Sequence, residues 1–256
     1  MNLEILVMGS GTSHGVPMIG CGCSVCGSSD PRDKRNRPSI LVSSDGCNIL
    51  IDTPPELRLS CLRFGVDHIE SVVFTHHHAD HIMGLDDIRR FNALKDGPMS
   101  CYGTALTLDE IKQTFRYAFG SHHYGGGLPI LELEEISGPF CVESVPFEPL
   151  SVMHGPTPVT GFRIGGFAYM TDVKSIPDET LDRLMGLDTL ILGVLRHRPH
   201  PTHLSVPEAL ELLQRIRPRQ TFFTHVAHDM GHRETEAGLP PSVRLAYDGM
   251  RLELDV

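Results

Sequence analysis

The sequence predicts an α/β protein in which layered β-sheets carry helices on their outer faces. Several short, nearly continuous apolar runs are bounded by Gly, Pro, Asp or His, a pattern typical of strands buried on both faces. Amphipathic helical segments lie between some of these runs, which indicates a layered α/β domain. The predicted strands cover residues 3–8, 39–44, 48–52, 71–75, 167–171, 188–193 and 220–224.

Two of the intervening helices begin at a recognisable capping pattern. Thr107 and Glu110 form the S/T-x-x-E pattern of a capping box, which predicts that a helix starts with the segment TLDEIKQTFRYAF. Ser205 and Glu208 repeat the pattern ahead of ALELLQRI. In both segments apolar residues recur at helical spacing, so each helix presents one face to a core.

Composition restricts the class of protein. Of 256 residues, 40% are hydrophobic and 21% are charged, which is ordinary for a soluble globular protein. No apolar run approaches the ~20 residues of a membrane span, and the first residues lack the basic region of a secretory signal. We therefore expect a cytoplasmic protein with no membrane partner, folded as a single domain over 1–256.

The net charge of −10 argues against a protein that mainly grips nucleic acid, because such proteins usually show a basic face. A small phosphorylated substrate is compatible with this charge, since bound divalent metals would reverse its sign locally. Whether the chain forms a homodimer stays open.

Residues able to bind metal follow the apolar runs repeatedly. Asp52, His76, Asp172 and His225 each lie at the end of a predicted strand, and His154 ends the further run EPLSVM. Active sites are commonly built at the ends of rigid strands. One such residue alone would be an ordinary turn residue, but these cases together favour a shared site.

The segment THHHADH gives the strongest signal. Its His76, His78, Asp80 and His81 have the spacing H-x-H-x-D-H. A histidine-rich surface loop is the alternative, but the other strand-end residues make coincidence a poor explanation. His76 and His78 can converge on one ion from a turn, while Asp80 and His81 turn toward a second ion. Imidazole with carboxylate suits Zn, Mn or Fe, so the residues do not identify the metal.

These motifs resemble those of the metallo-β-lactamase superfamily, whose fold is a four-layered αβ/βα sandwich. The resemblance covers nearly the whole chain: GSGTSHGVP, LIDTPPE, THHHADHIMGL, His154, the MTD around Asp172 and the THVAHD around His225. Within the superfamily, the chain is most similar to PhnP-type phosphoribosyl cyclic phosphodiesterases. The CGCSVC cluster and the pair His225 and His228 carry this closer resemblance.

The resemblance implies a site for two catalytic divalent metals, Mn or Zn. One metal would be held by His76, His78 and His154, the other by Asp80, His81 and His225, and Asp172 would bridge them. Two ions ~3.5–4 Å apart can activate a water as hydroxide and hold a phosphoryl oxygen against it. Asp80 and Asp172 are therefore predicted to be catalytic as well as ligands. A related branch with Glu in place of His78 binds a redox di-iron centre, so His here favours hydrolysis.

The cysteine cluster predicts one structural zinc. Cys21, Cys23 and Cys26 have C-x-C-x-x-C spacing, and a short turn of this kind can wrap a tetrahedral ion. A structural zinc requires four ligands, often three thiolates and one histidine, and the resemblance makes His228 the fourth. The zinc loop is expected at about 20–38. A loop with free thiols is the alternative.

The resemblance also implies that His203 is a general acid, which protonates the leaving oxygen. On the residues alone, His197, His200 and His203 are equally compatible with surface histidines. A helix that opens two residues later indicates the fixed turn that a catalytic acid needs. The neighbouring Arg196 and Arg198 either contact a phosphate or are solvated.

Two further features stay open at this level. Asp52 either orients a ligand histidine or serves only the turn after its strand. The glycine run in SHHYGGGLP, residues 121–129, is either a flap over the site or a flexible turn.

Together these observations predict a metal-dependent phosphodiesterase. It would hydrolyse a small ribose or nucleotide phosphodiester, including a five-membered cyclic phosphate, by a hydroxide that two metals activate. Cleavage of tRNA at the 3′ end is one alternative, although the chain shows no basic, Gly-rich insertion to grip tRNA. A non-catalytic metal-binding or regulatory domain is another, although every expected ligand is present. Thioester or lactone hydrolysis also stays open, because fold and metals do not choose the substrate.

Overall fold

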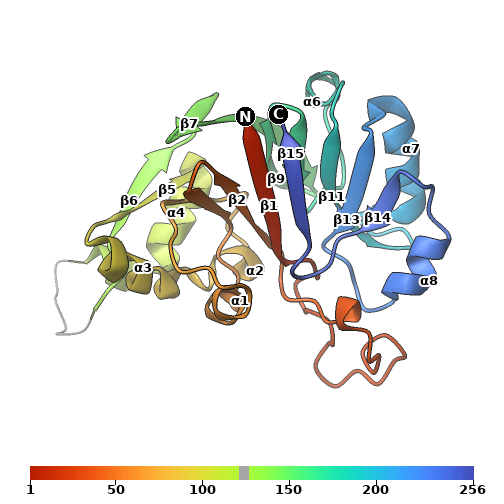
Figure 1. Cartoon of the computed structure of the whole chain (residues 1–256), viewed down its shortest axis with the longest axis horizontal. Coiled ribbons are helices and arrows are strands. Elements are labelled where there is room, and N and C mark those ends of the chain that lie inside the picture. Colours follow the sequence, from red (N-terminus) through yellow and green to blue (C-terminus); the bar gives the residue numbers. More distant parts are fainter. Residues whose placement is uncertain (121–126) are drawn as a thin grey trace.

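Figure 1 shows the computed structural model of the chain, which describes residues 1–120 and 127–256. Within these residues, two mixed β-sheets face each other and helices cover their outer faces. Helices α1, α3 and α4 lie on one flank of the molecule, and α6, α7 and α8 lie on the other (Figure 1). The predicted four-layered αβ/βα sandwich is confirmed.

The first sheet is antiparallel on one side and parallel on the other. Its strands run in the order β15 (Arg251–Asp255), β1 (Asn2–Gly9), β2 (Ser39–Ser44), β3 (Cys47–Ile51), β4 (Ser71–Val73), β5 (Met99–Gly103) and β6 (Leu131–Glu135). The pairs from β15 to β3 are antiparallel, and those from β3 to β6 are parallel.

The second sheet repeats this division. Its order is β14 (Val243–Leu245), β13 (Gln220–Thr224), β11 (Thr189–Arg196), β10 (Phe167–Met170), β9 (Thr157–Ile164), β8 (Val145–His154) and β7 (Phe140–Val142), and β12 (Leu204–Ser205) pairs with β11. The pairs from β14 to β10 are parallel, and those from β10 to β7 are antiparallel.

Short helices connect the strands. They are α1 (Leu57–Phe64), α2 (Ala79–Ile82), α3 (Ile88–Lys95), α4 (Ala105–Thr114), α5 (Arg116–Phe119), α6 (Asp178–Arg183), α7 (Val206–Ile216) and α8 (His232–Ala237), with 3₁₀ turns η1 (Pro31–Asp33) and η2 (Leu85–Asp87). Among the described helices, none combines the length and the apolar character needed to cross a bilayer.

The two predicted capping patterns have different outcomes. Ser205 and Glu208 form the expected capping box at the start of α7. The prediction for α4 is wrong by one turn, because Thr104 is the N-cap and the Thr107 amide donates to its hydroxyl over 3.4 Å. Thr104 has the extended backbone of an N-cap, whereas Thr107 already lies in the first helical turn.

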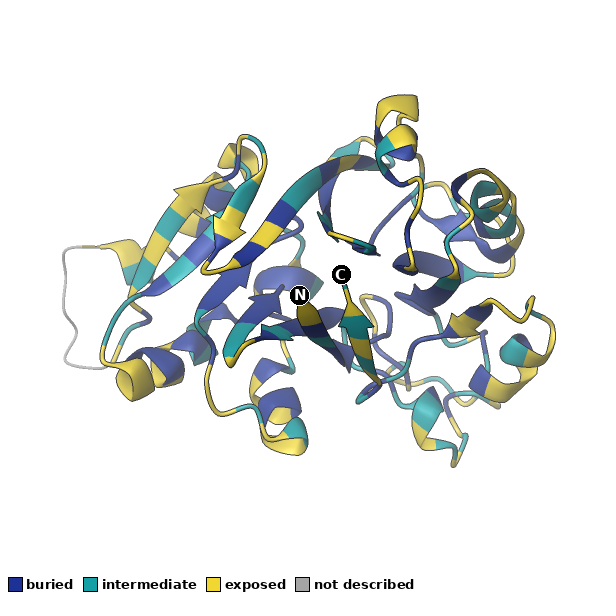
Figure 2. Ribbon diagram, turned by 45° about the horizontal axis from the view of Figure 1, so that its top comes forward, coloured by how far each residue is buried: buried dark blue, intermediate teal, exposed yellow. Residues whose placement is uncertain are grey.

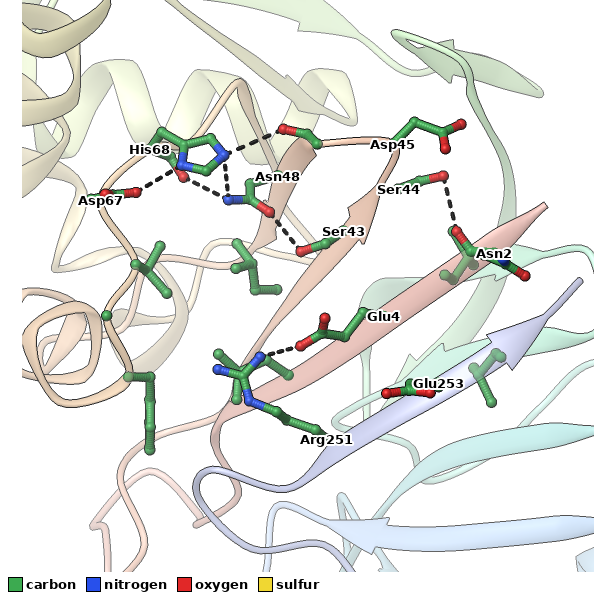
Figure 3. A pocket seen from close by; sticks show the side chains of 18 of the residues that line it. Asn2, Glu4, Ser43, Ser44, Asp45, Asn48, Asp67, His68, Arg251 and Glu253 are labelled. Carbon is green, nitrogen blue, oxygen red and sulfur yellow. Dashed lines mark hydrogen bonds and ion pairs between the residues drawn. The ribbon is translucent and has the colours of Figure 1, made fainter.

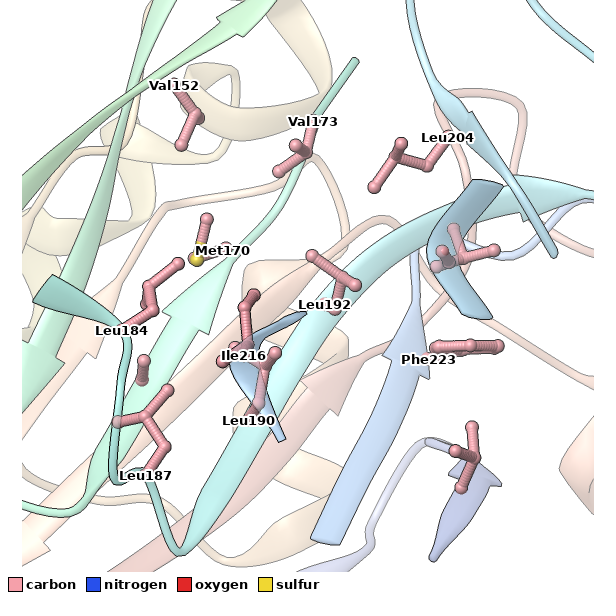
Figure 4. Close-up of a cluster of buried hydrophobic side chains, with 14 of the residues drawn as sticks. Val152, Met170, Val173, Leu184, Leu187, Leu190, Leu192, Leu204, Ile216 and Phe223 are labelled. Carbon is pink, nitrogen blue, oxygen red and sulfur yellow. The ribbon is translucent and has the colours of Figure 1, made fainter. Parts of the chain in front are cut away.

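Three clusters of buried apolar side chains fill the spaces between the four layers. In β1, Leu3, Ile5 and Val7 belong to the cluster between the sheets, while Leu6 and Met8 belong to the cluster under α1, α3 and α4. Figure 4 shows the third cluster, which packs the second sheet against α6 and α7. Because both faces of the central strands are covered (Figure 2), their sequences are almost continuously apolar.

A surface hollow of about 700 Å³ lies over β15, β1 and β2 (Figure 3). It is lined by Asn48 at the start of β3, the opposite end of this strand from Asp52. Several of its polar groups interact with each other: Arg251 pairs with Glu4, and the Asn48 amide lies 2.9 Å from His68 Nε2. None of the predicted metal-binding residues lines this hollow, so it is separate from them.

Candidate metal centre

The predicted metal-binding residues meet at one edge of the sandwich, where parallel strands of both sheets end. Asp52 follows β3 directly, His76 lies three residues after β4, and His225 follows β13 directly. Asp172 lies two residues after β10. The carboxyl ends of parallel strands are a common place for binding sites in α/β proteins.

Asp172 lies at the centre of this group, and its side chain is buried. Its Oδ2 is 3.0 Å from His81 Nε2, and its Oδ1 is 3.2 Å from His225 Nε2. The same Oδ1 is 3.9 Å from His154 Nε2 and 3.8 Å from His203 Nδ1. One carboxylate thus faces imidazoles from four separate segments.

The remaining predicted residues surround this carboxylate on two sides. Asp80 Oδ2 lies 3.5 Å from His81 Nε2 and 3.6 Å from His225 Nε2, which brings together one of the two predicted ligand sets. The rings of His76 and His78 are 4.5 Å apart between centroids, and those of His78 and His154 are 5.3 Å apart. The rings of the other predicted set are therefore neighbours, but the ligand atoms within 4.8 Å of one another on this side are those of His76, His81 and Asp172 and those of His154, Asp172 and His203.

Two contacts fix which ring nitrogen faces the centre. His81 Nδ1 donates to Asp52 Oδ2 over 2.7 Å, and His154 Nδ1 donates to the Thr202 carbonyl over 2.7 Å. Each Nδ1 then carries a proton, which makes Nε2 the ring nitrogen that faces the centre and could bind an ion. Thr75 holds the Asp52 carboxylate through its amide and its hydroxyl, both at 2.8 Å. Asp52 was expected either to orient a ligand histidine or to serve only its turn, and the structure shows it in contact with His81.

Three of the converging residues have a left-handed backbone. The φ angles of Asp52, Asp172 and His225 are 64°, 51° and 60°. Non-glycine residues adopt this region at an energetic cost, and such residues cluster at functional sites. In each case the left-handed residue lies within two residues of a strand end.

The electrostatics of the group favour a bound cation. Burial lowers the pKa of His76 well below its ordinary value and also lowers that of His78, so both rings are neutral at pH 7, the form that binds metal. Burial alone would raise the pKa of Asp172, but the imidazoles of His225 and His81 outweigh it and hold this pKa well below its usual range. Burial would lower the pKa of His81, but the surrounding carboxylates raise it well above its ordinary value.

Several buried ring nitrogens at the site make no hydrogen bond, and this observation bears on whether the residues could bind metal ions. Within the described residues, the Nε2 atoms of His76, His81 and His225 are buried and have no hydrogen-bond partner. Buried polar groups are normally paired, and an ion is one of the few explanations for an exception. Imidazole nitrogens and carboxylate oxygens are a ligand set typical of Zn, Mn and Fe. The residues present therefore fit divalent metals.

The cysteine cluster also assembles as expected. Cys21 Sγ lies 3.3 Å and Cys23 Sγ 3.5 Å from His228 Nδ1, and all four ligand atoms, with that of Cys26, lie within 4.8 Å of one another. The Cys26 amide and His228 lower the pKa of Cys23 to about 6, which favours the thiolate. Three sulfurs and one imidazole fit a tetrahedral structural zinc.

The segment before β12 brings His203 into the group. Its ring centroid is 4.3 Å from that of His154 and 4.8 Å from that of His225. Arg196 donates to backbone carbonyls of its own loop, and Arg198 is exposed with an Asp229 oxygen 4.0 Å away. The predicted glycine-run flap falls largely on 121–126, outside the described residues.

Two residues of this segment were missed as contributors to the site. Thr202 supplies the carbonyl that accepts from His154, and His200 lies against Thr202. A backbone acceptor carries no signal in the sequence, because any residue supplies a carbonyl. The sequence did not distinguish His200 from the neighbouring histidines, so its contact with Thr202 was not predicted.

A family model described as the beta-lactamase superfamily domain matches residues 47–226. Together with the layered fold, this match shows a domain of the metallo-β-lactamase fold. A crystal structure described as a new diphosphatase from the PhnP family is 41% identical, with a TM-score of 0.93, over 99% of this chain and 98% of that chain. The chain belongs to the metallo-β-lactamase superfamily and, within it, to the PhnP family.

Two curated relatives are similar to this chain over different lengths. An octanoyltransferase of Porphyromonas gingivalis is 37% identical over 258 residues, which are 99% of this chain and 52% of the relative. The chain thus spans about half the length of that relative. A ribonuclease Z of Clostridium acetobutylicum is 44% identical over 62 residues, or 23% of this chain and 20% of the relative.

Proposed function

We propose that this protein is a metal-dependent phosphodiesterase for small ribose or nucleotide phosphodiesters, including five-membered cyclic phosphates. Two catalytic divalent metals, Mn or Zn, would be held by His76, His78 and His154 on one side, by Asp80, His81 and His225 on the other, and by Asp172 between them. One structural zinc would be held by Cys21, Cys23, Cys26 and His228.

The observation that carries this proposal is the convergence of unpaired, buried imidazole nitrogens on one buried carboxylate. Left without a cation, these nitrogens are desolvated and make no hydrogen bond, although Asp172 lies close to two of them; an unsatisfied buried polar group costs roughly 1–3 kcal/mol. A bound ion would offset this cost. When bound there, divalent metals lower the pKa of a water and offset negative charge on a phosphoryl group.

The chain's own residues prepare the site for that chemistry. Asp52 and Thr202 keep the protons of His81 and His154 on Nδ1 and thereby orient both rings. Asp172 is held ionised and central by the facing imidazoles. Since these groups are fixed by hydrogen bonds and by the strand ends, little reorganisation is needed when a substrate binds.

His203 is the proposed general acid. Burial and the nearby His225 lower its pKa to about 3, so its ring is neutral at pH 7 before a substrate binds. A bound phosphodiester brings negative charge next to the ring, and such a charge raises the pKa of an imidazole. The ring would take up a proton from solvent as the substrate binds, and would then donate it to the leaving oxygen.

The similarity to the PhnP-family diphosphatase supports phosphate chemistry and also supplies a second candidate function. Because that relative is described as a diphosphatase, hydrolysis of a phosphoanhydride between two small groups is the alternative. The match to ribonuclease Z covers 23% of the chain, and a net charge of −10 disfavours a tRNA substrate.

A substrate panel separates these candidates. Purified protein loaded with Mn or Zn is incubated with ribose 1,2-cyclic phosphate, 2′,3′-cyclic nucleotides, linear phosphodiesters, dinucleoside diphosphates and a tRNA precursor. We expect the highest kcat/KM on a small phosphodiester. A preference for the diphosphates would establish the second candidate, and no turnover of any phosphate compound would refute both.

A further inference from the structure

We propose that His200 and Thr202 form a positioning pair. The pair would hold the rings of His154 and His203 at fixed positions beside Asp172. The proposal rests on the proposed function for its catalytic consequence. Its structural basis is a set of contacts around one residue, Thr202, which belongs to the loop that leads into β12 and packs against the end of β8.

Thr202 is tied to the end of β8 in two ways. Its carbonyl accepts from His154 Nδ1 over 2.7 Å. Its methyl group packs so closely on Gly155 that a Cβ added there would lie 2.8 Å from Thr202 Cγ2. Gly155 also has a φ of +60°, so this position disfavours a side chain for two independent reasons.

His200 holds the other side of Thr202. The Thr202 amide donates to His200 Nδ1 over 3.3 Å, and the Thr202 hydroxyl oxygen lies 3.2 Å from the same nitrogen. Nδ1 accepts only when the ring is neutral and carries its proton on Nε2. The half-buried His200 ring also lies 5.1 Å from that of His203 between centroids.

The loop between β11 and β12 is held by hydrogen bonds at both ends. The contacts between His200 and Thr202 hold the part between those ends. At the start, the Arg196 guanidinium donates to the carbonyls of Arg198 and Pro199, over 3.2 and 2.9 Å. At the end, the Leu204 amide donates to the Val173 carbonyl over 2.7 Å. The Thr202 contacts lie between these two anchors.

One peptide segment therefore serves two site residues. The carbonyl of Thr202 sets the tautomer and orientation of His154, and the next residue in the chain is His203. If His200 releases Thr202, the ring of His154 loses a firmly placed acceptor and His203 loses its fixed distance from Asp172. A residue whose only role is to fill space would not affect both.

The test compares four variants at two readouts. His200→Phe keeps a ring but removes the acceptor, and His200→Asn restores an acceptor near the position of Nδ1. Thr202→Val keeps the shape and removes the hydroxyl. His197→Phe is the matched control, because His197 is exposed on the same loop. The readouts are the rate at which a chelator strips the catalytic metals, and kcat and KM on a cyclic ribose phosphate.

We expect His200→Phe to lose about 10–100-fold in kcat, with faster metal loss, because it releases the Thr202 carbonyl that holds the proposed ligand His154, and loss of such a partner typically costs this much. KM should change less than kcat. His200→Asn should recover most of both losses, Thr202→Val should lose less than His200→Phe, and His197→Phe should match the parent. Metal loss and kcat in His200→Phe equal to those in His197→Phe would overturn the proposal.

The chelator readout keeps the two proposals distinguishable. If the protein turns over no phosphate substrate, the proposed function fails, but faster metal loss in His200→Phe alone still supports the positioning pair. If His200→Phe does not fold, Thr202→Val takes its place. Parent-like metal loss and parent-like kinetics in Thr202→Val would then refute the pair.

Discussion

Asp172 has the most demanding position of any residue at the site, since both of its oxygens face imidazoles and its backbone is left-handed. Asp172→Asn keeps the shape and removes the charge. We expect it to lose at least one catalytic metal and to reduce turnover by more than 100-fold, because the proposed bridge between the two ions is broken. Elemental analysis and kcat on a small phosphodiester measure both effects.

His78→Ala provides a second, milder test of the same proposal. We expect it to weaken one of the two metal positions and abolish most turnover, while the thermal unfolding of metal-free protein stays close to the parent's. Asp182→Asn, an exposed substitution on α6, is the control. Activity within tenfold of the parent in either Asp172→Asn or His78→Ala would contradict the two-metal proposal.

His203→Ala tests the acid role through the leaving group. A ribose hydroxyl leaves as a strongly basic alkoxide unless it is protonated, and positioned acid catalysis is typically worth about 10²–10⁴-fold. The variant should lose that much on a cyclic ribose phosphate and far less on bis(nitrophenyl) phosphate, whose leaving anion needs no proton. Equal losses on both substrates, or a change in metal content, would point to a ligand or positioning role instead.

The candidate site was predictable at this scale because its side chains are chemically unusual. Imidazoles and carboxylates directly after apolar runs have few structural explanations, so His76, Asp172 and His225 were identifiable from the sequence. The orientation of the rings was not, because it depends on hydrogen bonds to Asp52 and to a backbone carbonyl of Thr202.

Among the elements, the central strands were the most predictable. The structure reproduces the predicted bounds of β2 and β13, both buried on two faces. Strands β6 and β15 were missed because they lie at sheet edges and alternate Leu with acidic residues. Strand β9 contains Pro158 and Gly161, which disfavour strand in a local reading. Their pairing partners, which local sequence does not reveal, define these strands.

The loop that carries the cysteine cluster is connected to the candidate metal centre. His228 lies three residues from His225, and between them Val226 hydrogen-bonds through its amide to the Ser10 carbonyl and through its carbonyl to the Thr12 amide. A structural ion that fixes His228 would therefore also restrain the backbone around His225.

Cys23→Ser is expected to remove about one metal per chain and to lower the thermal midpoint, because a structural zinc contributes folding free energy directly. Retention of the catalytic metals should also fall modestly, through the restraint on His225. Elemental analysis and calorimetry provide the measurements. Cys141→Ser is the matched control, because Cys141 is exposed. Unchanged metal content and midpoint in Cys23→Ser would rule out the structural site.

On the scale of the whole molecule, the metal centre joins the two sheets. His76 and Asp80 follow a strand of the first sheet, whereas Asp172 and His225 follow strands of the second. A ligand that binds only the folded state stabilises it by an amount that grows with ligand concentration. The catalytic metals should therefore stabilise the molecule as one cooperative unit.

Removal of the metals with a chelator should lower the thermal midpoint of the parent, and added Mn or Zn should restore it in a concentration-dependent way. At 100 times the dissociation constant, the expected stabilisation is about 2.7 kcal/mol for one site. In Asp172→Asn the restoring effect should be much smaller. A midpoint that does not respond to chelator or metal would contradict the proposed centre.

The two chain ends lie side by side, as the N and C labels in Figure 1 show, with the Met1 amino group donating to the Val256 carbonyl over 2.8 Å. They are at the start of β1, and the eight residues of that strand separate them from the metal centre by about 25 Å, at roughly 3.3 Å per residue. A reporter domain fused at residue 1 or at residue 256 would therefore lie at the far end of β1 and leave the candidate centre accessible.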